Sequence, residues 1–206
     1  SELFEERLSA TEGLLQAMLS CRKIKRPIYL AVDEWNVWYR AHGAEALEEV
    51  YNLEDALMTG LQLNAFLRHA RWVKMANLAQ IVNVIAPILT RPEGLLLQSI
   101  YFPFLLYSQH AGQEVLDVHW EGDTFEGGGQ AGLRVLDVAS TLAEGGQVAL
   151  FVVNRSRDRH AETTIRLQEG CWAGVGRAWV ANGPDIKAVN TFDDPHVVGM
   201  TEHTVA

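Results

Sequence analysis

One short segment of the sequence gathers most of the residue types that could do chemistry. The segment DEWNVWY (residues 33–39) holds two carboxylates, an amide and three aromatic rings, and it follows the apolar run IYLAV (28–32). Such a run predicts a short strand buried on both faces. Because side chains alternate along a strand, Asp33 and Glu34 are expected to point to opposite sides. One carboxylate is then expected to face a pocket and the other to join the pocket wall.

The rings and the amide of this segment favour a sugar as the ligand. Trp35 and Trp38 offer flat apolar faces on which sugars stack, and the amide of Asn36 can bond hydroxyl groups. A second interpretation of the same residues is an acidic turn that caps a helix, with both tryptophans in the core. Aromatic and acidic residues often meet at strand ends, so the segment alone does not decide between the two.

The elements around the segment alternate between helix and strand. Apolar residues at three- and four-residue steps predict a helix over 3–18, either continuous or divided at Gly13. A helix with one apolar face is predicted from Leu53 to Leu67, a strand over 71–76, and a proline-kinked helix over 99–112. Strand–helix–strand–helix order with short connections predicts parallel strands with right-handed crossovers.

The fold class predicted for the whole chain is α/β followed by all-β. Residues 1–112 are too few for a complete (β/α)8 barrel, which typically takes about 250 residues, so they are expected to form its last βα units. Residues 113–206 are expected to form an antiparallel, jelly-roll-like β-sandwich, either in full or in part. Its predicted strands are 115–120, 133–138, 148–153, 163–167 and 177–180.

Composition narrows the class of protein further. The 206 residues carry a net charge of −9, which argues against nucleic acid or a membrane surface as a partner. Hydrophobic residues make up 48%, enough for a core, yet no run is long enough to span a membrane. Cys21 and Cys171 lie far apart, and the histidines are scattered without metal-ligand spacing, so no metal site is expected. No signal peptide is recognised, which favours a cytoplasmic location.

Five motifs together resemble the α-L-arabinofuranosidases of glycoside hydrolase family 51. They are DEWNVWY, then YNLEDAL (51–57), KMANLAQIVNVIAP (74–87), SIYFPF (99–104) and KAVNTFDDP (187–195). They occur in the order of the family and extend over about residues 25–200. A chance similarity would reproduce one such motif rather than five.

The resemblance implies roles for individual residues. The glutamate of DEWNVW is the family's nucleophile, at the end of the seventh barrel strand, which gives that role to Glu34. Trp38 is implied to line the sugar site, and Gln80 in ANLAQ to hydrogen-bond the substrate. Leu47 aligns with a residue near the pocket, and Asn190 is expected to be structural. The implied reaction is retaining hydrolysis that releases terminal α-L-arabinofuranosyl groups from arabinoxylan, arabinan or their oligosaccharides, without a cofactor.

The second carboxylate that this mechanism needs has no counterpart in the sequence. In the family it is a glutamate from an earlier strand, in a motif resembling GNE(M/L)DGPWQ, which does not occur here. Five acidic residues follow Glu34 but align with nothing catalytic, and the last two read as first-turn charges of a helix capped by Asn52. These five are Glu45, Glu48, Glu49, Glu54 and Asp55.

Three hypotheses follow. The chain is the C-terminal portion of a family 51 arabinofuranosidase, with an N-terminal part elsewhere and, by resemblance, a hexameric assembly. Alternatively, it is a sugar-binding or structural module that is inactive alone. A third possibility is an endoglucanase-like retaining hydrolase with the same kind of barrel.

Overall fold

The computed structural model describes residues 2–39, 47–174 and 176–205, which form three helices and eleven strands. The helices are α1 (Glu2–Cys21), α2 (Leu53–Arg68) and α3 (Tyr101–His110). The first four strands are β1 (Leu30–Trp35), β2 (Val73–Leu78), β3 (Ile88–Arg91) and β4 (Gly94–Leu97). The others are β5 (Glu114–Leu116), β6 (Thr124–Gly127), β7 (Gln130–Arg134), β8 (Leu136–Leu142), β9 (Val148–Asn154), β10 (Gly176–Asn182) and β11 (Gly199–Val205).

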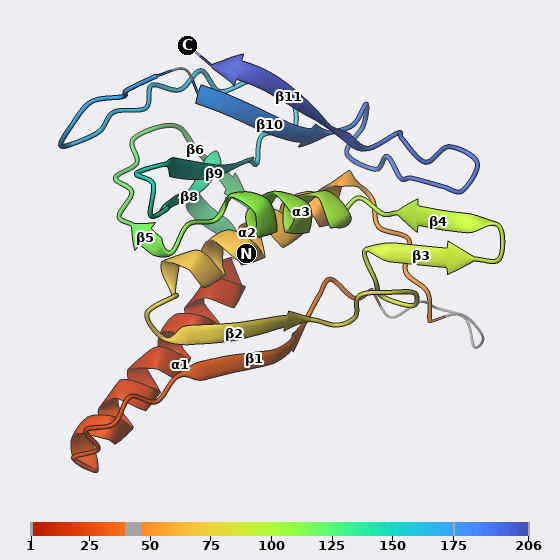
Figure 1. The fold of residues 1–206 in the computed structure, drawn as a ribbon. Coiled ribbons are helices and arrows are strands. Elements are labelled where there is room, and N and C mark those ends of the chain that lie inside the picture. Colours follow the sequence, from red (N-terminus) through yellow and green to blue (C-terminus); the bar gives the residue numbers. More distant parts are fainter. Residues whose placement is uncertain (1, 40–46, 175, 206) are drawn as a thin grey trace.

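The first part of the chain has the predicted alternation of helix and strand. β1 and β2 pair in parallel, and α2 is the crossover between them. In Figure 1 the two strands run side by side, with α2 and α3 on one side of them. Of the two possibilities for the N-terminal helix, the continuous one is correct, because α1 passes through Gly13 without a break.

The N-terminus of α2 is set by a reciprocal cap that the sequence predicts in part. The side chain of Asn52 accepts from the backbone N–H of Asp55 (3.3 Å), and the Asp55 carboxylate accepts from the backbone N–H of Asn52 (2.8 Å). Both bonds satisfy donors that a helix start would otherwise leave without partners. Asn52 is therefore the N-cap, as predicted, while Asp55 does more than add charge to the first turn.

The core covers only one face of the β1–β2 pair. Leu8 of α1, Trp35 of β1, Phe66 of α2 and Val73 of β2 are buried together, and Phe104 of α3 packs against them. The prediction of a strand buried on both faces is wrong, because Ala31 is exposed and so is Tyr29 just before β1. Helices cover one face of the pair, and no element of the described part of the chain is packed on the other.

A hairpin follows β2 that the sequence analysis did not predict. β3 and β4 pair antiparallel over Ile88–Arg91 and Gly94–Leu97. In Figure 1 this hairpin lies on the side to which the arrows of β1 and β2 point. The apolar run and its prolines gave no two-residue alternation from which two four-residue strands could be read.

The second part of the chain consists of antiparallel pairs, as predicted, with different strand bounds. β5, β8 and β9 form a three-stranded sheet, while β6–β7 and β10–β11 are two-stranded. The strand predicted over 163–167 is wrong, because this exposed stretch pairs with nothing in the described residues, and Ile165 is 50% exposed. The strand predicted over 133–138 spans the junction of β7 and β8, and β6 and β11 were not predicted.

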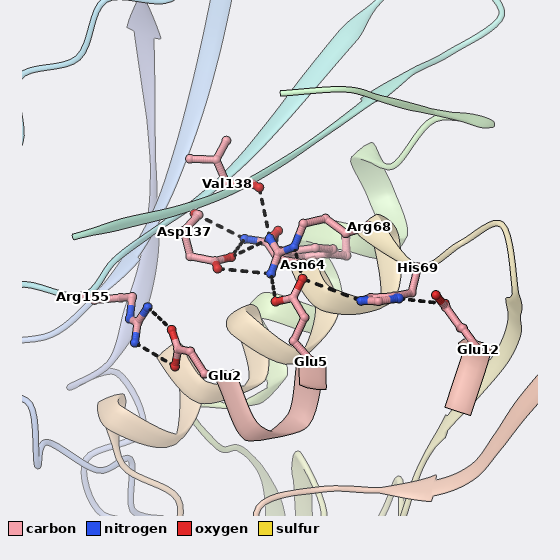
Figure 2. Close-up of polar contacts among 10 residues, drawn as sticks. Glu2, Glu5, Glu12, Asn64, Arg68, His69, Asp137, Val138 and Arg155 are labelled. Carbon is pink, nitrogen blue, oxygen red and sulfur yellow. Dashed lines mark hydrogen bonds and ion pairs between the residues drawn. The ribbon is translucent and has the colours of Figure 1, made fainter. Parts of the chain in front are cut away.

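A cluster of charged residues ties α1 and α2 to β8 (Figure 2). The Arg68 guanidinium donates to Glu5 (2.7 Å) and to Asp137 (3.0 and 3.2 Å). His69 Nδ1 lies 2.7 Å from a carboxylate oxygen of Glu12. These five residues, named the Arg68 cluster below, join segments that lie 57 to 69 positions apart in the sequence.

Other contacts join the C-terminal segment to the first part of the chain. Asn190 is buried, and its amide donates to the backbone carbonyls of Leu97 (3.0 Å) and Val198 (2.9 Å) while accepting from the Val198 N–H (2.7 Å). The expectation that Asn190 is structural is therefore confirmed. Lys187 forms an ion pair with Glu54 at the start of α2.

Candidate active site at the carboxyl ends of β1 and β2

Glu34 and Gln80 lie at the same edge of the parallel pair. Glu34 is the penultimate residue of β1, and Gln80 follows the end of β2 by two residues. Trp35 and Leu78, which end the two strands, are partners in the ladder. Since parallel strands end at the same edge of a sheet, the two predicted site residues belong to one edge.

Both carboxylates of DEWNVWY are exposed. The expectation that one of Asp33 and Glu34 is tied into the wall is wrong. A register shift between Val32 and Trp35 interrupts the regular alternation on which that expectation rested. Within residues 2–39, 47–174 and 176–205, neither side chain forms a hydrogen bond or ion pair. A carboxylate without a partner at a strand end is available to act on a ligand.

The two tryptophans of the segment have different environments. Trp35 is 6% exposed, stacks on Phe104 at 5.4 Å between ring centroids and meets Phe66 edge-on at 5.1 Å. Trp38 is 54% exposed. The interpretation of the tryptophans as core is thus correct for Trp35 and wrong for Trp38. Of the two rings, that of Trp38 is the one exposed enough for a sugar to stack on its face.

Asn36 binds the backbone rather than offering its amide hydrogens to a ligand. Its Nδ2 donates to the carbonyl oxygens of Ala79 (2.8 Å) and Ile85, and its Oδ1 accepts from the N–H of Val37 (2.7 Å). The expectation that this amide bonds substrate hydroxyls therefore does not hold for its two donors. Asn36 instead fixes the end of β1 to the loop that carries Gln80.

Gln80 and Leu47 are both at the surface. Gln80 is exposed, and its Nε2 donates to the carbonyls of Val82 (3.2 Å) and Asn83 (3.1 Å), which orients the amide within its own loop. Leu47 is 67% exposed. Like Glu34 and Trp38, both residues are therefore exposed at the surface of the described structure.

The carboxylates considered as acid/base candidates are engaged elsewhere or exposed. Glu49 accepts from the Tyr39 N–H (3.0 Å), and Asp55 accepts from the Tyr39 hydroxyl. Glu54 pairs with Lys187, and Glu48 is exposed. Glu45 lies outside the described residues. Glu49 and Asp55 are therefore structural acceptors in this chain.

Burial keeps the groups around Asp55 neutral more readily than in water. Burial and the hydrogen bond to Asp55 raise the pKa of the Tyr39 hydroxyl, and burial beside Glu49 and Asp55 raises that of Tyr51. Burial also raises the pKa of Asp55, although its bond from Tyr39 works in the opposite direction. The two tyrosines are hydrogen-bond donors throughout the physiological pH range.

The buried amide of Gln98 joins Tyr51, Glu49 and Ala86, and the sequence did not predict this role. It is 1% exposed, its Nε2 donates to the carbonyls of Ala86 (2.7 Å) and Glu49 (3.2 Å), and its Oε1 accepts from the Tyr51 N–H (3.0 Å). A polar residue between the apolar run of β4 and α3 was the available signal, because a buried amide must find partners.

Among residues 2–39, 47–174 and 176–205, no group of three His, Cys, Asp or Glu side chains is arranged to hold a metal ion. None of the described helices is long and apolar enough to cross a membrane.

Glu34 and Trp38 are thus exposed at or just beyond the carboxyl end of β1, which is where the active sites of βα folds lie. The chain belongs to the family described as "Alpha-L-arabinofuranosidase C-terminal domain", which matches residues 33–206. It corresponds to the C-terminal portion of glycoside hydrolase family 51 arabinofuranosidases.

Known proteins of this family resemble the chain over most of its length. It is 37% identical over 184 residues to the probable α-L-arabinofuranosidase C of Aspergillus clavatus, covering 85% of this chain and 35% of the relative. The GH51 α-L-arabinofuranosidase structure from Thermotoga petrophila aligns with a TM-score of 0.88 and 31% identity, covering 100% of this chain and 44% of that one. The Thermotoga maritima α-L-arabinofuranosidase in complex with arabinose aligns with a TM-score of 0.85 and 32% identity, over 98% and 44% of the two chains. The chain thus spans about a third of the curated relative and under half of the solved structures.

Proposed function

We propose that this chain supplies the nucleophile side of the active site of a retaining α-L-arabinofuranosidase, with Glu34 as the nucleophile. The observation that carries the proposal is the exposed, unpaired carboxylate of Glu34 at the carboxyl edge of β1 and β2. The family membership supports the same conclusion.

We also propose how the two parts of the chain complete larger folds. β1 and β2 are taken as the last two strands of a (β/α)8 barrel within residues 1–112, and residues 113–206 as a β-sandwich. Support comes from the helices, which cover one face of the parallel pair and leave Ala31 on the other face exposed. In a barrel, helices lie outside and the inner face is filled by the remaining strands.

The reaction takes two steps that share one pair of carboxylates. A Glu34 oxygen attacks the anomeric carbon, an arabinosyl ester forms, and the leaving oxygen takes a proton from a second carboxylic acid. That second group then removes a proton from water, which attacks the anomeric carbon and releases arabinose and Glu34. In retaining enzymes the two carboxyl groups are about 5–5.5 Å apart, and the acid/base is proposed to come from outside this chain.

The proposed substrate carries terminal α-L-arabinofuranosyl groups, as in arabinoxylan, arabinan and their oligosaccharides. Trp38 is proposed to line the sugar site, Gln80 to hydrogen-bond the sugar, and Leu47 to lie near the pocket. Their exposure supports these roles. That the Thermotoga maritima relative was solved with arabinose supports the sugar.

The experiment that tests this function needs a complete barrel. We define the exchange chimera as the Thermotoga petrophila enzyme with its aligned region replaced by residues 1–206 of this chain. We expect it to hydrolyse 4-nitrophenyl α-L-arabinofuranoside and not cellooligosaccharides, whereas the 206-residue chain alone is expected to be inactive. Cleavage of cellooligosaccharides instead would favour an endoglucanase-like hydrolase.

The nucleophile itself is tested in the same chimera by Glu34→Ala. The variant is expected to lose hydrolysis, and added azide is expected to occupy the vacated space and give an arabinosyl azide of inverted configuration. Asp33→Ala is the matched control, because the neighbouring carboxylate is also exposed. Unchanged hydrolysis by Glu34→Ala would contradict the proposal.

By resemblance, we also propose a cytoplasmic homo-oligomer, in the form of a hexamer. Light scattering coupled to size-exclusion chromatography of the exchange chimera tests the assembly. A monomer at micromolar concentration would contradict it.

A further inference from the structure

The residues directly before and after Trp38 form hydrogen bonds with buried side chains. The Tyr51 hydroxyl donates to the carbonyl of Val37 (2.7 Å), directly before Trp38. Directly after it, the Tyr39 N–H donates to Glu49 (3.0 Å), and the Tyr39 hydroxyl donates to Asp55. We name Tyr39, Glu49, Tyr51 and Asp55 the Trp38 clamp.

Three of the four clamp residues are deeply buried, whereas the Trp38 ring is exposed. Glu49 is 6% exposed, and Tyr51 and Asp55 are 0% exposed, against 54% for Trp38. Burying two carboxylates and a hydroxyl is costly unless each has a partner. These groups are therefore arranged to hold residues 37 and 39 in one position.

The clamp is itself bonded to the cap of α2 and to the buried Gln98. Asp55 accepts from the backbone of Asn52 and so belongs to the cap that starts α2. The backbone N–H of Tyr51 donates to Oε1 of the buried Gln98 (3.0 Å). The position of the Trp38 backbone is thus fixed relative to α2 and to the segment before α3.

We propose that Tyr39, Glu49, Tyr51 and Asp55 are positioning residues that hold the Trp38 ring ready to bind the arabinofuranosyl group. This inference rests on the proposed function. A ring on an unsupported surface segment would have to be ordered when the sugar binds, and ordering lowers affinity. The clamp orders the segment in advance, so its contribution is to sugar binding rather than to the attack by Glu34.

A double-mutant cycle in the exchange chimera tests the proposal. Tyr39→Phe keeps the ring and removes only the hydroxyl that bonds Asp55. We expect the KM for 4-nitrophenyl α-L-arabinofuranoside to rise about three- to tenfold, with kcat within about twofold, since lost uniform binding appears in KM. In a Trp38→Ala background the same substitution is expected to change KM by less than about 1.5-fold, because its effect passes through the ring.

Two further variants separate positioning from general stability. Tyr51→Phe removes the bond to Val37 and runs through the same cycle with the same expectation. Tyr107→Phe is the matched control, because its hydroxyl bonds Asn64 (2.6 Å) and Gly60 (3.2 Å) between α3 and α2, away from residues 37–39. It is expected to lower thermal stability without changing KM.

Three results would overturn the inference. They are an unchanged KM in both tyrosine variants, a KM effect that persists in full without Trp38, and loss of the fold in both variants, which would assign the clamp to folding. A chimera without Glu34-dependent hydrolysis of arabinofuranosides would overturn the proposed function together with this inference. The two failures are therefore distinguishable.

Discussion

The Arg68 cluster and the strand-end segment DEWNVWY are both rich in carboxylates but differ in how those carboxylates are paired. In the cluster, Glu5, Asp137 and Glu12 each lie 2.7–3.2 Å from a nitrogen of Arg68 or His69. Figure 2 shows these contacts as dashed lines. In the segment, the Glu34 carboxylate has no partner in the described part of the chain. Paired charges hold elements together, whereas an unpaired carboxylate at the end of a strand is available to bind a ligand.

This difference predicts that substitutions in the strand-end segment lower activity with little effect on stability, and that substitutions in the Arg68 cluster do the reverse. The largest effect is expected for Glu34→Gln in the exchange chimera, where kcat for the aryl arabinofuranoside falls by roughly 10³-fold or more. The free energy of unfolding should change by less than about 0.5 kcal/mol, because the side chain is exposed and unbonded. Kinetics and urea denaturation measure the two quantities. Glu48→Gln, another exposed glutamate, is the control and should change neither.

Arg68→Met is expected to have the opposite effect. The methionine keeps much of the apolar stem but leaves Glu5 and Asp137 without their cation. Breaking a fully buried pair costs about 3–5 kcal/mol, and the 28% exposure of the Arg68 side chain reduces this to about 2–3 kcal/mol. Urea denaturation should show this loss with an unchanged kcat. A loss below about 0.5 kcal/mol would remove the distinction between the regions.

Asn52→Ala tests a residue that contributes to both stability and the site, because Asn52 caps α2 and is bonded to Asp55 of the Trp38 clamp. Loss of an N-cap side chain costs about 1 kcal/mol of stability. The thermal midpoint should fall accordingly, and KM should rise less than in Tyr39→Phe, because the Tyr39–Asp55 bond remains. A KM increase larger than that of Tyr39→Phe would place the cap inside the binding machinery.

The pH dependence of stability gives the smallest expected effect. Burial opposes ionisation of Glu5, but the hydrogen bonds and charge of Arg68 outweigh it, and the pKa of Glu5 lies below its ordinary value of 4.5. A lowered pKa in the folded state means that the ionised Glu5 stabilises above about pH 4.5, and that this contribution is lost as pH falls through the folded pKa. The stability difference between the unaltered chimera and Glu5→Gln should therefore be about 1 kcal/mol at neutral pH and shrink as the pH falls below about 4.5. A difference that grows with acidity would contradict this pairing.

The features of the fold that the sequence predicted are those set by residues close together in the chain. The Asn52 cap and the parallel β1–β2 pair follow from short patterns that tertiary packing did not override. The strand over 163–167 failed because alternation alone does not supply a partner strand. The β3–β4 hairpin was missed because its strands are only four residues long.

The sequence indicated which segment carries the candidate site, but not which residues hold that segment in place. Residue type and place pointed to DEWNVWY, and the family resemblance selected Glu34 within it, but nothing local distinguished the buried Trp35 from the exposed Trp38. Gln98 and Asp137 bond residues 47 and 69 positions away, and such pairings come from the fold rather than from local pattern. Tertiary contacts therefore decided which polar residues are structural and which remain available.

Covalent trapping tests the role of Glu34 most directly. The exchange chimera is incubated with an arabinofuranosyl fluoride that carries fluorine at C2, which slows both steps, while the good leaving group lets the ester accumulate. Peptide mass spectrometry is then expected to find the fluoroarabinosyl mass on Glu34 and on no other carboxylate. Inactivation with the label on a different residue, or turnover with no covalent species, would contradict the account.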